Sequence, residues 1–249
     1  DHRDLHSFPT RRSSDLWSEE QLNSEEIYTC FLNETTNQWS FNWDWWDSQT
    51  NASILQGANG FYINCPLGMP REPWWFEEDG VTLSKWGIQT GNFYAGVQAH
   101  LEDLRDNNAT NWFKYCYIYF IDEFQMFIPE GYERDEYFIL LEGFLSLINS
   151  SAPDVKIMTT TPPSRELLNI RKYIDIYCPI TSDYDKEEWN AAMAEGKEMW
   201  MYPCVGPQAP WPNSHLYNRL YEIRVLYWQV FYYKIQGFLY WSSSAYYHG

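Results

Sequence analysis

The sequence predicts an α/β fold, and within that class a (β/α)8 barrel of the TIM type. From about residue 95 onward, runs rich in aromatic and β-branched residues alternate with amphipathic segments, a spacing typical of βα units. No glycine-rich phosphate loop follows any of the strand-like runs, which argues against a dinucleotide-binding sheet. These two observations favour the barrel.

The expected helices are identified by apolar residues at helical spacing and by their end signals. In residues 95–107, Val97, Leu101 and Leu104 share one face. Asp185 is an expected N-cap, with Glu188 three residues later, and Gly196 is an expected stop. The segments are residues 95–107, 134–151, 164–170, 185–196 and a long helix over 217–237 that ends at Gly237.

The expected strands lie between these helices. They are residues 115–121, 155–161, 173–179, 198–204 and 238–241, with an earlier strand and loop within 60–68. The tryptophan-rich stretch 39–47 fits neither a helix face nor a strand face and is expected to be a loop. Its Trp43, Trp45 and Trp46 either pack on the barrel wall or stack on a sugar.

The first sixteen residues look foreign to the fold. Residues 1–16 have no hydrophobic period and no apolar core of a signal peptide, and they resemble a translated sequencing adapter. We therefore expect a non-native segment at 1–16 and one barrel domain at 17–249. We also expect the barrel to lack its first strands, and we leave open whether its last strands are missing too.

Composition and charge exclude several classes of partner. A formal net charge of −17 argues against nucleic acid, which is bound by clustered Lys and Arg. No apolar run approaches the ~18 residues of a membrane span. The five cysteines show no zinc-ligand spacing, so we expect no metal and no cofactor. Four glycosylation sequons, at Asn33, Asn51, Asn108 and Asn149, favour a secreted glycoprotein.

The strongest candidate site lies at the end of the strand 115–121. Seven largely apolar residues stop at two adjacent acids, Asp122 and Glu123. In a barrel, side chains at the carboxyl ends of strands line the active site. The alternative is that the acids cap the next helix or simply meet solvent.

The other strand ends supply hydroxyls, an asparagine and aromatic rings, the lining expected of a sugar pocket. They supply few acids for a second catalytic carboxyl: Glu198 begins its strand, and Asp183 and Asp185 are outside candidates. A pair of neighbouring acids suffices if the 2-acetamido group of the substrate is the nucleophile, one of the known exceptions to the two-carboxylate rule.

Five stretches of the sequence resemble the catalytic domain of glycoside hydrolase family 123 and its wider relatives, over about residues 95–241. They are NWFKYCYIYFIDEFQ, TTTPP, IDIYCPITSDYD, GKEMWMYPCVGPQAPWPN and YEIRVLYWQVFYYKIQGFLYW.

The resemblance implies a retaining hydrolase of terminal β-linked N-acetylgalactosamine, or of a related 2-acetamido sugar, that reacts through an oxazolinium. Asp122 would stabilise that ion and Glu123 would be the general acid and base. The resemblance also implies looser substrate contacts at Tyr184, Tyr202, Asn213, Tyr240 and Trp241. The sequence departs from its relatives at Phe124, where proline is common.

Two other functions stay open: a glycan-binding barrel without turnover, and a hydrolase of another glycan. The expected partner is a glycan in each case. On the long helix, Arg224, Trp228 and Tyr232 share one face and are expected to pack in the core.

Overall fold

The computed structural model describes residues 30–58, 60–67, 77, 82–108, 110–120, 122, 128, 131–164, 168–215 and 218–239. The chain forms two compact units. Of the described residues, those from 30 to 119, with 128 and 131–156, form the N-terminal unit, and those at 120, 122 and from 157 to 239 form the C-terminal unit.

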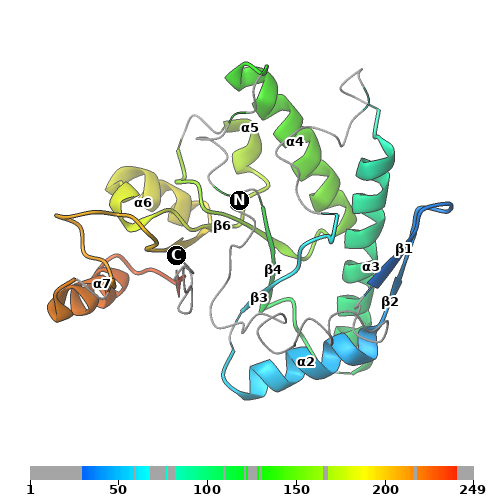
Figure 1. Cartoon of the computed structure of the whole chain (residues 1–249), viewed down its shortest axis with the longest axis horizontal. Coiled ribbons are helices and arrows are strands. Elements are labelled where there is room, and N and C mark those ends of the chain that lie inside the picture. Colours follow the sequence, from blue (N-terminus) through cyan, green and yellow to red (C-terminus); the bar gives the residue numbers. More distant parts are fainter. Residues whose placement is uncertain are drawn as a thin grey trace, which may run out of the picture. The chain divides into compact units, whose positions relative to one another are not determined.

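The N-terminal unit contains a hairpin and a parallel βαβ arrangement. β1 (Cys30–Asn33) pairs antiparallel with β2 (Gln38–Phe41), and β3 (Phe61–Tyr62) pairs in parallel with β4 (Cys116–Tyr119). The helices are α2 (Trp43–Leu55), α3 (Lys85–Asn107) and α4 (Arg134–Ser151). Figure 1 shows the hairpin beside α3, and α3 also packs on α4. The buried residues of α3 include the predicted Val97, Leu101 and Leu104.

The tryptophan-rich stretch is not a loop, and that prediction is wrong. Its first residues, including Trp39, belong to β2, and Trp43, Trp45 and Trp46 begin α2, where the Asn42 side chain accepts the Trp45 N–H. The Trp43 ring lies between Phe41, at 4.3 Å, and His100 of α3, at 4.0 Å. Aromatic stacking across three elements therefore fixes the helix start.

Two further contacts hold the same cluster together. His100 Nε2 lies 2.7 Å from Asp47 Oδ1 of α2. Trp46 contacts Phe61 and Trp112 edge to face. Trp43 and Trp46 are therefore used for packing, as the first of the two sequence interpretations expected.

The C-terminal unit is built from parallel strands that neighbour each other in chain order. These are β5 (Lys156–Thr159), β6 (Ile176–Tyr177), β7 (Glu198–Met201) and β8 (Gly237–Phe238). The connections contain α5 (Leu168–Arg171), the 3-10 turn η4 (Thr181–Asp183), α6 (Lys186–Ala194) and α7 (Leu220–Tyr232). Parallel strands joined by helices confirm the α/β prediction.

Local end signals place α6 where the sequence expects it. The Asp185 carboxylate accepts the N–H groups of Glu187 and Glu188, each at 2.9 Å. Beyond the helix, Gly196 adopts a φ of 82°, a left-handed conformation that glycine allows without strain.

α7 ends earlier than predicted. The helix stops at Tyr232, and Lys234 takes a φ of 57°, while Gly237 already begins β8. Trp228 and Tyr232 are 69% and 78% exposed, so the prediction that they pack in the core is wrong for this structure.

An ion pair between the buried Arg171 and the exposed Glu195 ties α5 to α6. The Arg171 guanidinium donates to both Glu195 oxygens, at 2.8 and 3.0 Å, and to the Pro163 carbonyl at 3.0 Å. Burial alone would lower the pKa of Arg171, but the hydrogen bonds to Glu195, together with the nearby charges of Glu195, Tyr177 and Glu188, raise that pKa. The pair connects the segment after β5 to the end of α6.

Candidate functional site

Asp122 is anchored at the carboxyl end of β5. Phe120 donates its backbone N–H to the Met158 carbonyl of β5, at 2.7 Å. Two residues further on, Asp122 Oδ1 accepts a hydrogen bond from Thr160 Oγ1, also at 2.7 Å. The half-buried Asp122 carboxylate therefore lies where a parallel sheet presents functional side chains.

Register shows which side chains share a face with Thr160. Thr159, Tyr177 and Met199 are paired across β5, β6 and β7, and all three are fully buried. Successive side chains of a strand point to opposite faces. The following residues Thr160, Cys178 and Trp200 consequently form a row on the other face.

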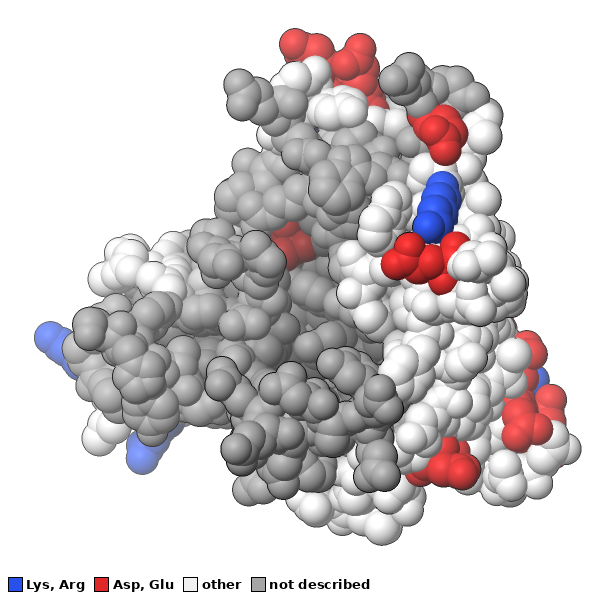
Figure 2. Space-filling view, turned by 45° about the vertical axis from the view of Figure 1, so that its right-hand side comes forward, with Lys and Arg blue, Asp and Glu red and all other residues white. Residues whose placement is uncertain are grey.

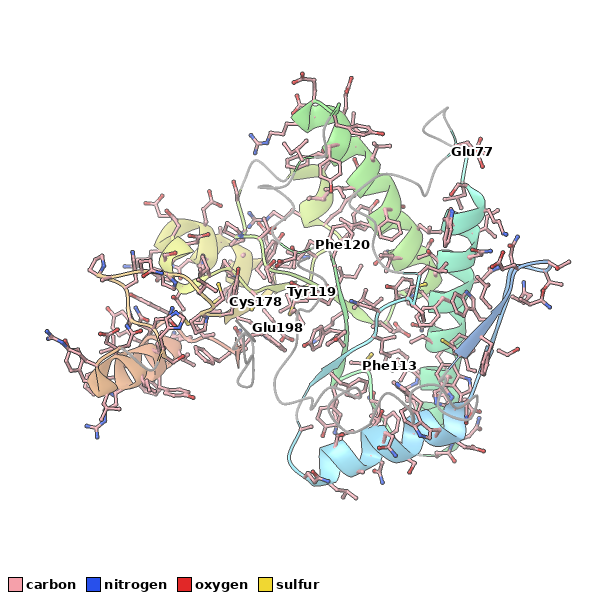
Figure 3. The ribbon with its side chains drawn as sticks, in the orientation of Figure 1. Glu77, Phe113, Tyr119, Phe120, Cys178 and Glu198 are labelled. Carbon is pink, nitrogen blue, oxygen red and sulfur yellow. The ribbon has the colours of Figure 1, made fainter. Side chains whose placement is uncertain are left out.

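Cys178 supplies a neutral thiol beside the acid. Its side chain is fully buried, and burial raises the pKa of the thiol, with the negative charge of Asp122 as a second cause in the same direction. The thiol therefore stays protonated across the physiological range. Figure 3 labels Cys178 and Phe120, which come from two different segments of the C-terminal unit.

Trp200 is a residue of this face that the sequence analysis does not single out. Its indole N–H donates to Glu198 Oε2 at 3.3 Å. Gly237 of β8 is its register partner, and a Cβ atom built there would overlap the indole ring. The pairing of this tryptophan with a glycine on the next strand could have identified it, but that pairing is recognised only when the strand register is known.

The predicted aromatic contacts lie in two different settings. Tyr202 follows β7, is buried, and exchanges backbone hydrogen bonds with Pro179 and Thr181. Tyr184 stacks on Tyr233 with ring centroids 3.8 Å apart and meets Trp189 edge to face at 4.8 Å. In this structure Tyr184 packs the loop after β6 against the end of α7.

Asn213 braces the loop between β7 and α7. Its side-chain nitrogen donates to the carbonyls of Cys204 and Pro207, at 3.1 and 3.2 Å, and its Oδ1 accepts the Ser214 N–H at 2.7 Å. The side chain is almost completely buried. Its bonds shape the loop that the sequence analysis assigned to the pocket.

Glu222 holds the other end of the same loop. Its carboxylate accepts from the Asn218 side chain and from the Asn213 and Arg219 N–H groups. The Asn218 hydrogen bond is the main cause that lowers the pKa of Glu222.

Three other predicted site residues, Glu123, Tyr240 and Trp241, lie outside the described residues.

The less favoured candidates for a second catalytic carboxyl, Asp183, Asp185 and Glu198, lie within the described residues. Asp185 is occupied as the cap of α6, and Glu198, at the start of β7, accepts from Trp200. Asp183 accepts a hydrogen bond from Ser182, and partial burial raises the pKa of its carboxyl.

The charge on the visible surface of the described residues is mainly acidic. In Figure 2, acidic side chains gather at several places on the visible face and basic ones are few. No group of three or more His, Cys, Asp or Glu among the described residues could hold a metal ion. No helix in the same residues is long and apolar enough for a bilayer.

Comparison with protein families gives a decisive result. The model of the glycoside hydrolase 123 catalytic domain matches residues 81–248. The chain belongs to this family.

The matched range of this family 123 chain contains Asp122, Thr160, Cys178 and every predicted site residue. It begins after the hairpin and α2, so the tryptophan-rich stretch 39–47 precedes it. No curated protein matches the chain. Membership makes the chain part of a glycoside hydrolase family, whose general chemistry is cleavage of a glycosidic bond.

Proposed function

We propose that this protein is a retaining glycoside hydrolase that releases terminal β-linked N-acetylgalactosamine, or a related 2-acetamido sugar. The acetamido group of the substrate is the nucleophile. Family membership supports the hydrolase class, and the acetamido substrate rests on the neighbouring acids Asp122 and Glu123.

The reaction has two steps, each with inversion at the anomeric carbon. In the first, the acetamido carbonyl oxygen bonds to C1 as the bond from C1 to the leaving oxygen breaks, and Glu123 gives its proton to that oxygen. Asp122 stabilises the positive charge on the nitrogen of the oxazolinium. In the second, Glu123 takes a proton from water, which attacks C1, reopens the ring and restores the acetamide.

The observation that carries this proposal is the hydrogen bond from Thr160 to Asp122. A carboxylate that stabilises a developing cation must be held in place before the charge forms. Thr160 holds it from the end of β5, and Cys178 beside it is a neutral thiol that does not compete for the cation.

The proposal includes a (β/α)8 barrel as the complete fold. Within each unit, the parallel strands follow one another in chain order without the reversal that marks a doubly wound sheet. The polar carboxyl ends of β5, β6 and β7 also match the active-site face of such barrels.

The test compares two aryl glycosides that differ only at C2: β-N-acetylgalactosaminide and β-galactoside. We expect turnover of the first alone, because the plain galactoside lacks the nucleophile. The anomeric configuration of the initial product, followed by NMR, should be β. Turnover of both substrates at similar rates would exclude participation of the acetamido group.

A second candidate function is a hydrolase that uses a protein nucleophile or base on another glycan. Asp183, which follows β6, is the candidate for the second carboxyl in such a reaction, and partial burial raises its pKa, the direction that suits a general acid. In that case plain galactosides or other glycans would be cleaved, and Asp183→Asn would abolish their turnover. Binding of these sugars without cleavage of any of them would instead support the other open function, a glycan-binding barrel without turnover.

We also propose that the protein is a secreted glycoprotein. The acceptor asparagines Asn33, Asn51, Asn108 and Asn149 are all exposed, as an oligosaccharide requires. Expression through a eukaryotic secretory pathway should give a product whose mass falls on endoglycosidase treatment. A product of unchanged mass would refute glycosylation of this chain.

A matched set of variants locates the modified positions. Replacing the sequon threonine or serine (Thr35, Ser53, Thr110 or Ser151) by alanine should remove one glycan at a time. At the first sequon, replacing Asn33 itself would also disrupt a turn, because the Asn33 side chain accepts the Thr35 and Thr36 N–H groups. Changing Thr35 leaves that turn intact.

A further inference from the structure

We infer that Thr160 is a positioning residue that sets the orientation of the Asp122 carboxylate for the reaction. This role rests on the proposed function. Its basis is the 2.7 Å hydrogen bond between the two side chains, whose donor comes from a rigid strand end.

The strand end around Thr160 is immobilised on both sides. Thr159, Thr160 and Thr161 are all buried. The Thr159 carbonyl accepts the Cys178 N–H at 2.8 Å, and the Thr161 N–H contacts Thr159 Oγ1 at 3.3 Å. The χ1 angle of a buried, β-branched threonine is restricted, so the position of its hydroxyl oxygen is fixed and the hydrogen bond that it donates orients the carboxylate.

The backbone that carries Asp122, the acceptor of this hydrogen bond, is also held in place. The segment that carries Asp122 is fastened to β5 two residues earlier, through the Phe120 N–H and the Met158 carbonyl. The Thr160 bond then fixes rotation of the carboxyl group itself. A carboxylate can accept about four hydrogen bonds, so an amide N–H of a substrate can be bound as well.

Alternation places Thr159 and Thr160 on opposite faces of the sheet. Thr159 lies on the face of Tyr177, whereas Thr160 lies on the face of Cys178. Thr161 lies in the bend after β5, and its backbone N–H donates to the Thr159 side chain. Thr161 is therefore a matched control, with the same side chain and comparable burial, whereas the hydrogen bond to Asp122 comes from Thr160.

The experiment compares Thr160→Val, Thr160→Ser and Thr161→Val on the aryl β-N-acetylgalactosaminide. Thr160→Val should lower kcat about 10- to 100-fold, the effect of losing a hydrogen bond to a charged group. Its KM should change less than kcat, because the oxazolinium charge exists only after the substrate is bound. Thr160→Ser keeps the hydroxyl and should restore most of the rate.

Folding is controlled by thermal unfolding of all three variants. If Thr161→Val and Thr160→Val lose kcat equally, or if Thr160→Ser is as slow as Thr160→Val, the hydroxyl has no positioning role and the inference fails. A wild-type level of kcat in Thr160→Val overturns it as well, while the proposed function stands. A wild-type protein that turns over no acetamido substrate overturns the proposed function and this role with it.

Discussion

Asp122→Asn and Glu123→Gln are expected to lower turnover of acetamido glycosides by different amounts on different leaving groups. Asp122→Asn removes the charge that stabilises the oxazolinium, a loss of about 10²–10³ in kcat whatever the leaving group. Glu123→Gln removes the proton donor, a loss of about 10²–10⁴ on basic leaving groups. On activated aryl leaving groups the second loss should shrink.

The measurement is kcat for both variants across aryl glycosides of decreasing leaving-group pKa. Glu187→Gln is the charge-matched control, because Glu187 is an exposed acid on the first turn of α6, and it should keep the wild-type rate. Equal losses of kcat in the two variants across the series would show that Asp122 and Glu123 do not have the two separate roles proposed. An unaffected Asp122→Asn protein would remove this carboxylate from the reaction altogether.

The elements that the sequence predicts best are those with local end signals. α4 has the expected bounds, Arg134–Ser151, and its start carries a capping box formed by Glu133 and Glu136. α6 begins at the predicted cap Asp185. Such signals lie within four residues of the helix end, so a single sequence is enough to find them.

Elements stabilised by distant contacts were mispredicted. The stretch 39–47 contains too many tryptophans for a helical or strand period, yet it forms β2 and the start of α2. Its order comes from Phe41, Trp43 and His100 stacking on one another. His100 lies more than fifty residues away in the chain, and no local pattern announces such a contact.

The candidate site was predicted in the same uneven way. The end of an apolar strand at Asp122 is visible in the sequence, because strand ends carry functional groups in a barrel. The choice of Thr160 among three consecutive threonines is not visible, since it depends on the register of β5 with β6. The proximity of the buried Cys178 to Asp122 likewise emerges only from the fold.

Gly237 is structurally important, as the sequence suggests, but for a different reason from the one predicted. The sequence predicts that it ends a long helix, but α7 ends at Tyr232 and Lys234 makes the left-handed turn. Gly237 is instead the first residue of β8, opposite Trp200. The glycine is needed there because the indole lies where a Cβ atom would be.

Gly237→Ala is therefore expected to destabilise the protein by about 1–3 kcal/mol, the usual cost of overpacking. The contact involves ring atoms close to the Trp200 backbone, which a rotation of the distal ring cannot relieve. For a chain of this size the melting temperature should fall by roughly 2–10 °C. Thermal unfolding of the purified variant measures this directly.

A double-mutant cycle with Trp200→Ala assigns the cost to this contact. Without the indole, Gly237→Ala should change the free energy of unfolding by less than about 0.5 kcal/mol, because the added methyl meets open space. An equal cost in both backgrounds would mean that the strain arises in the β8 backbone and not from Trp200. Because Trp200 shares a face with Thr160 and Cys178, a large coupling energy would also show that β8 fixes a side chain of the candidate site.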